Sequence, residues 1–94
     1  MAVAIVMDFA GGTLAQYDQV IEKMGFTPGG EGAPEGQFHW VAATDDGIRV
    51  VDVWNSREAF DTFAQEQIGP ITAEFGLAPP EMAFFDIHNT LRTG

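Results

Sequence analysis

The residues of this sequence that are suited to acid–base chemistry lie within apolar stretches. His39 stands between two aromatic residues, and Asp52 stands between two valines. An imidazole is a common general base, whereas a carboxylate in an apolar strand needs a hydrogen-bond donor when it is buried. We therefore expect His39 to abstract a proton and Asp52 to orient or polarise the reacting groups. The alternative is that His39 is a structural histidine, half buried in a strand and hydrogen-bonded to a neighbour.

Tyr17 and His88 are further candidates for contact with a substrate. The phenol of Tyr17 can donate a hydrogen bond to a substrate oxygen. The alternative is a core tyrosine whose hydroxyl reaches the rim. His88 ends the last apolar stretch, where we expect it to contact the substrate. Its alternative is an exposed or capping residue.

Aromatic side chains are candidates for the walls of a ligand pocket. Trp54 would form the wall on which a substrate ring packs, and the full set suited to a flat apolar ligand is Trp40, Trp54, Phe60, Phe63 and Phe84. The alternative is that they form an ordinary hydrophobic core. His39 and His88, with Asp52 or Asp86, lack the compact spacing of metal ligands, so we predict no metal site and no cofactor.

The composition limits the chain to one domain and argues against some partners. It has 94 residues, is 46% hydrophobic and has no cysteine, so we predict a single folded domain over residues 1–94 in the cytoplasm. The net charge of −10 argues against binding to nucleic acid or an anionic membrane surface. This charge either keeps the protein soluble or steers a cationic ligand toward it. The apolar N-terminus is too short for a membrane span.

The hydrophobic pattern predicts four strands and two helices. The strands are expected over residues 3–9, 37–44, 48–54 and 81–88. One helix begins after Thr13 and ends at Gly25, and a second begins after Ser56 and is bent or interrupted at Gly69-Pro70. Residues 26–36 are rich in glycine and proline, which predicts a loop long enough to act as a lid.

The order βαββαβ predicts an α+β, ferredoxin-like fold with a four-stranded antiparallel sheet and both main helices on one face. The other face of such a sheet is bare. Because the first and last strands are apolar on both sides, we expect a second copy of the chain to cover that face.

The register of the predicted hairpin decides which residues share a face. A turn at Asp46-Gly47 places His39 opposite Trp54, whereas a three-residue turn places Trp40 opposite Asp52. Asp52 and Trp54 share a face in both registers, and the sequence leaves open whether His39 joins them.

The element order and the segment 51–63, VDVWNSREAFDTF, resemble the dimeric α/β-barrel superfamily, in particular the small proteins grouped with antibiotic biosynthesis monooxygenases. The resemblance covers nearly the whole chain. It implies a dimer whose two sheets close into a barrel, with a ligand cleft between sheet and helices in each subunit. Haem-degrading members resemble this chain least, because their Asn, Trp and His set has no match here.

Together these features predict a cofactor-independent enzyme of monooxygenase, cyclase or isomerase type. It would act by proton abstraction on a small aromatic or polyketide-like substrate, with His39, Asp52 and Tyr17 in catalytic roles and Trp54, Trp40, Phe63, Phe84 and His88 in contact with the substrate. The alternative is a non-catalytic dimeric module for small-molecule binding or oligomerisation.

Overall fold

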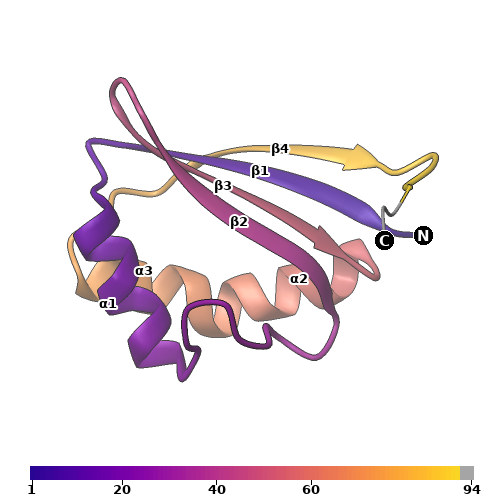
Figure 1. Cartoon of the computed structure of the whole chain (residues 1–94), viewed down its shortest axis with the longest axis horizontal. Coiled ribbons are helices and arrows are strands. Elements are labelled where there is room, and N and C mark those ends of the chain that lie inside the picture. Colours follow the sequence, from indigo (N-terminus) through magenta and orange to yellow (C-terminus); the bar gives the residue numbers. More distant parts are fainter. Residues whose placement is uncertain (92–94) are drawn as a thin grey trace.

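The computed structural model describes residues 1–91 and confirms the predicted α+β, ferredoxin-like fold. Four antiparallel strands form one sheet in the order β2-β3-β1-β4, and the helices lie on one side of it (Figure 1). The elements are β1 (Val3–Ala10), α1 (Leu14–Met24), β2 (Gly36–Thr44), β3 (Gly47–Trp54), α2 (Arg57–Phe63), the π-helical segment η1 (Ala64–Ile68), α3 (Gly69–Glu74) and β4 (Glu81–Asp86). The last strand is therefore two residues shorter than predicted, and His88 lies beyond it.

The core lies between the sheet and the helices. Alternate residues of β1, namely Val3, Ile5, Met7 and Phe9, are buried because they point toward the helices. In β3 the residues Ile48, Val50, Asp52 and Trp54 are buried on the same side. One carboxylate thus lies in an otherwise apolar layer.

The first helix begins and ends as predicted. The Thr13 side chain accepts a hydrogen bond from the Gln16 N–H at 3.1 Å, and the Gln16 side chain accepts one from the Thr13 N–H at 3.0 Å. This reciprocal pair satisfies N–H groups that a helix start leaves without partners. Gly25 ends the helix with a left-handed φ of 90°. The capped helix holds Tyr17 over the sheet.

The second helix, predicted to be bent or interrupted at Gly69-Pro70, has no gap there, and the irregularity is instead the π-helical segment η1, which ends directly before these residues. Proline lacks an N–H and its ring clashes with the carbonyl four residues earlier in a regular helix. The wider π turn accommodates it: the Gly69 N–H bonds to the carbonyl of Ala64, five residues back. The continuous helix brings Phe63 and Ile68 to the same cavity.

Both predicted hairpin registers are wrong. The turn residues are Asp45 and Asp46, and Gly47 pairs with Thr44 as part of β3. A Cβ atom on Gly47 would lie 2.0 Å from the carbonyl oxygen of Phe9, so the neighbouring strand, rather than the turn, requires glycine there. His39 consequently pairs with Asp52.

None of the helices within residues 1–91 is both long enough and apolar enough to cross a membrane.

Candidate active site

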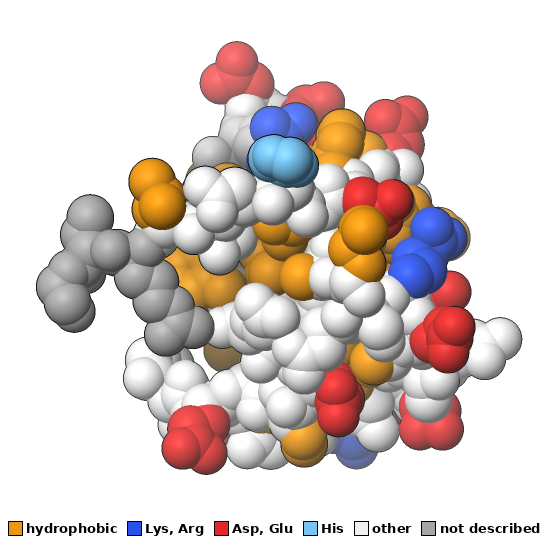
Figure 2. Space-filling view, turned by 90° about the vertical axis from the view of Figure 1, so that its right-hand side faces the viewer, with side chains coloured by type: hydrophobic (Ala, Val, Ile, Leu, Met, Phe, Trp, Pro, Cys, Tyr) orange, Lys and Arg blue, Asp and Glu red, His pale blue; other side chains and the backbone are white. Residues whose placement is uncertain are grey.

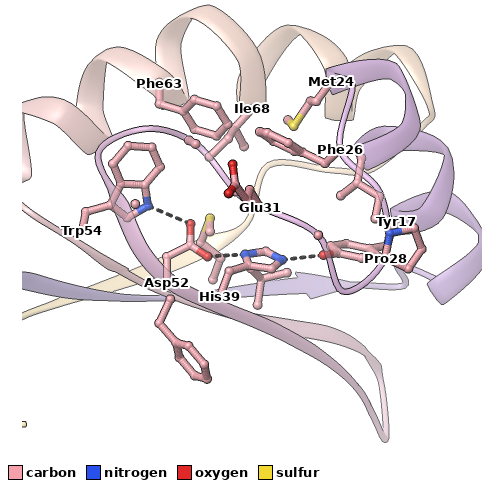
Figure 3. A pocket seen from close by; sticks show the side chains of 18 of the residues that line it. Tyr17, Met24, Phe26, Pro28, Glu31, His39, Asp52, Trp54, Phe63 and Ile68 are labelled. Atoms are coloured by element: carbon pink, nitrogen blue, oxygen red, sulfur yellow. Dashed lines mark hydrogen bonds and ion pairs between the residues drawn. The ribbon is translucent and has the colours of Figure 1, made fainter. Parts of the chain in front are cut away.

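Four side chains form a continuous hydrogen-bonded chain on the helix-facing side of the sheet (Figure 3). The Tyr17 hydroxyl on α1 bonds to Nε2 of His39 on β2. His39 Nδ1 lies 2.5 Å from Oδ1 of Asp52 on β3, and Trp54 Nε1 lies 3.1 Å from Oδ2 of Asp52. The structure therefore brings together the three residues predicted to be catalytic and the tryptophan predicted to be beside them.

The donors and acceptors of this chain determine where its protons lie. An indole N–H only donates, so Asp52 Oδ2 is the acceptor from Trp54. Oδ1 accepts from Nδ1 of His39, which leaves Nε2 of a neutral imidazole as an acceptor for the Tyr17 hydroxyl. The basic nitrogen of His39 is thus directed at Tyr17, and the carboxylate behind it is positioned to stabilise an imidazolium.

Asp52 is held in place by its burial and its two donors. Its side chain is 6% exposed, whereas that of His39 is 42% exposed. A buried carboxylate is stable only when its oxygens are hydrogen-bonded, and both oxygens of Asp52 are. Within the described residues, no buried side-chain nitrogen or oxygen lacks a partner. The hydrogen bonds to both oxygens explain why β3 tolerates a buried carboxylate at Asp52.

Burial raises the pKa of Tyr17 to about 12, and the negative charges of Asp52 and Asp18 add to the effect. The phenol therefore keeps its proton at neutral pH. It can pass a proton on while receiving another, but it does not persist as a phenolate.

A cavity of about 390 Å³ opens beside this chain, between the sheet, α1 and the α2–η1–α3 helix. Its size lies within the range of small-molecule sites. Tyr17, His39, Asp52 and Trp54 line one part of it, and Phe63 and Ile68 face them from the long helix (Figure 3). Polar groups capable of proton transfer thus line a cavity whose other walls are largely apolar.

Three residues predicted to contact a substrate lie outside this cavity. Trp40 is on β2 next to His39, so it points to the opposite face of the sheet. Phe84 packs edge-on against Phe60 and lies under the Arg57 guanidinium, 3.5 Å from the ring centroid. His88 is exposed beyond the end of β4. Of the predicted substrate contacts, only Trp54 and Phe63 line the cavity.

Comparison with known proteins supports the architecture. No protein-family model matches the sequence, and no curated protein matches it either. Among solved structures, a proposed antibiotic biosynthesis monooxygenase from Chloroflexus aurantiacus aligns over 100% of both chains with a TM-score of 0.66 and 18% identity. SnoaB, a cofactor-independent oxygenase from Streptomyces nogalater, aligns over 98% of this chain and 97% of its own, with a TM-score of 0.63 and 17% identity. The chain has the fold of antibiotic biosynthesis monooxygenase-like proteins.

The covering loop, residues 26–35, is the part of the site that the sequence did not predict in detail. At one end the Phe26 N–H bonds to the Ile21 carbonyl at 2.9 Å, and the ring of Phe26 packs against Phe63. At the other end the Glu35 carboxylate accepts a hydrogen bond from Asn55 at 2.9 Å. Glu31 lies between these ends and lines the cavity. The density of glycine and proline indicated a loop but not which of its side chains would line the cavity.

Proposed function

We propose that this protein is a cofactor-independent enzyme that removes a proton from a small aromatic or polyketide-like substrate bound in the cavity. The observation that carries the proposal is the hydrogen-bonded chain from Tyr17 through His39 to Asp52, which borders the cavity. The description of SnoaB as a cofactor-independent oxygenase supports the same general kind of chemistry.

The hydrogen bonds that link Tyr17, His39 and Asp52 suggest a proton relay through Tyr17. A substrate C–H bond beside a carbonyl group would lose its proton to the Tyr17 oxygen while the phenolic proton moves to Nε2 of His39. The electron pair of the C–H bond would remain on the substrate as an enolate. Asp52, bonded to Nδ1 of His39, would stabilise the resulting imidazolium. Because Tyr17 gains one proton as it loses another, its pKa of about 12 is no obstacle.

The aromatic walls favour a flat substrate. Trp54 and Phe63 have ring centroids 5.0 Å apart, and Phe26 lies beyond Phe63. An aromatic substrate would pack on these rings with its carbonyl group beside Tyr17, which places the reacting carbon near the relay.

We also propose that a second copy of the chain covers the outer face of the sheet. Phe38 is 64% exposed and Phe85 is 56% exposed, and Trp40 lies on the same face. An apolar patch of this kind is unusual for a monomer. A twofold dimer would bury the face of one sheet against that of the other.

Proton abstraction can be tested without identifying the natural substrate. Anthrone, a three-ring ketone with an acidic methylene group, is a suitable probe. In deuterated buffer under nitrogen, the protein should accelerate the exchange of the methylene protons, followed by mass spectrometry. His39→Ala should lower this acceleration by roughly a hundred-fold or more, the usual contribution of a general base.

His88→Ala is the matched control, since this second histidine lies outside the cavity. Exchange that is equally fast in His39→Ala would exclude His39 as the base. Tight binding of anthrone without accelerated exchange would instead favour the non-catalytic binding module. Oxygen uptake, measured separately, would separate an oxygenase from a cyclase or isomerase.

A further inference from the structure

The cavity is lined by carboxylates but by no lysine or arginine. Two carboxylates line it, Asp52 and Glu31, and none of its lining residues is a lysine or an arginine. The lysine and arginine residues within 1–91 lie elsewhere, each paired with an acid: Lys23 with Glu74, Arg49 with Asp8 and Arg57 with Asp61. An anionic ligand would therefore meet no lysine or arginine there, and the imidazole of His39 is already bonded to Asp52.

The two carboxylates are in different situations. Asp52 is buried, and both of its oxygens accept hydrogen bonds from the relay. Glu31 is an exposed residue of the covering loop, and no side chain of residues 1–91 donates a hydrogen bond to it. In Figure 3 the Glu31 carboxylate projects into the space between Asp52, His39 and Ile68. Its charge is thus available to a bound ligand.

The aromatic lining also favours a positively charged ligand. Tyr17, Phe26, Trp54 and Phe63 line the cavity, and the faces of aromatic rings attract cations. The protein as a whole is also strongly acidic, with a net charge of −10, and the face shown in Figure 2 carries more acidic than basic side chains. Such a field attracts cations and repels anions before they enter.

We propose that Glu31 sets the charge class of the substrate, so that the cavity accepts cationic and neutral aromatic molecules and rejects carboxylates and phosphates. This inference rests on the proposed function, because it describes the ligand of the same cavity. An anion would lose its hydration and face two carboxylates with no lysine or arginine to compensate. An ammonium group would instead meet Glu31 and the aromatic faces. The cavity should therefore favour a free aromatic compound over one that is attached to a phosphate-bearing carrier.

A matched series of probes tests the inference by binding alone. Naphthylmethylamine, naphthylmethanol and naphthoate share a two-ring body and are cationic, neutral and anionic at neutral pH. Titration calorimetry on the full chain should rank their affinities in that order. Glu31→Gln should lower the ratio of amine affinity to naphthoate affinity by roughly three- to ten-fold, as expected for one exposed charge that attracts the amine and repels naphthoate.

Glu22→Gln is the matched control, because it removes the same charge from an exposed position on α1 outside the cavity. This variant should keep the wild-type ratio. An equal ratio in Glu31→Gln and wild type, or tighter binding of naphthoate than of the amine, would overturn the inference while leaving the proposed function intact. Failure of all three probes to bind would contradict both.

Discussion

The indole N–H of Trp54 donates a hydrogen bond to Oδ2 of Asp52, two residues earlier on the same face of β3. This bond fixes the carboxylate so that its other oxygen meets His39. Trp54 therefore orients Asp52 as well as forming a wall of the cavity.

Trp54→Phe should separate these two roles. Phenylalanine keeps an aromatic wall but leaves Asp52 Oδ2 buried without its donor, which should lower the free energy of unfolding by about 1–3 kcal/mol. Urea denaturation measures this loss. Trp40→Phe is the control, since the Trp40 indole makes no hydrogen bond within residues 1–91 and phenylalanine keeps an apolar ring at the proposed dimer face, so it should change stability much less. Equal losses in the two variants would argue against the buried hydrogen bond.

The titration of Tyr17 can be observed directly, because it is the one tyrosine of the chain. The near-ultraviolet absorbance of the phenolate should rise with a midpoint near pH 12 in the folded protein, against an ordinary pKa of 10.0. Asp52→Asn should lower the midpoint, because it removes a negative charge that raises this pKa. A midpoint near the ordinary value in the folded wild type would contradict the buried phenol.

The raised pKa of Tyr17 also determines how the free energy of unfolding changes with pH. At pH values between the two pKa values, the unfolded chain loses the phenolic proton while the folded chain keeps it. The contribution of Tyr17 to stability should therefore be complete below about pH 10 and disappear as the pH rises toward about 12. Tyr17→Phe should flatten this part of the urea-denaturation profile.

Tyr17→Phe should also reveal the relay. The ring remains, so binding of anthrone should change little, while the exchange rate at saturation should fall by roughly a hundred-fold. A loss confined to binding would mean that the substrate passes its proton straight to His39. Measuring the rate over a range of anthrone concentrations separates the two effects.

The hairpin register predicts that the protein tolerates alanine in place of Gly32 but not in place of Gly47. Gly47→Ala should lower the free energy of unfolding by about 1–3 kcal/mol or more, because the new methyl group would overlap the Phe9 carbonyl. Gly32→Ala is the control, since a Cβ there meets nothing within 4 Å. A neutral Gly47→Ala would argue for a different register.

The proposed dimer gives a further prediction. Trp40→Glu should convert a dimer at micromolar concentration into a monomer, because it puts a charge into the apolar outer face. Leu14→Glu, which introduces the same charge at another exposed apolar position on α1, should leave the assembly unchanged. Sedimentation equilibrium measures both. A wild-type protein that sediments as a monomer would exclude the dimer.

Local signals in the sequence predicted most of the fold. The Thr13–Gln16 pair and Gly25 set the limits of α1 because capping depends on nearby residues. The alternation of β3 placed Asp52 and Trp54 on one face. The pairing of His39 depended on a contact between Gly47 and Phe9, which are 38 positions apart in the chain, and no turn preference encodes such a contact. Glu31 was missed because a loop without periodicity does not show which of its side chains point inward.

The attachment of the covering loop at its two ends has a consequence for how such a protein can diversify. Phe26 and Glu35 are anchored to α1 and to the β3–α2 junction, whereas Tyr17, His39 and Asp52 stand on α1, β2 and β3. Residues 27–34, apart from Gly29 with its left-handed φ of 72° and Gly30, where a Cβ would lie 2.5 Å from Thr27 Oγ1, can therefore mutate with little effect on the anchors or on Tyr17, His39 and Asp52. New ligand preferences can arise by drift within this short segment while the reaction is preserved.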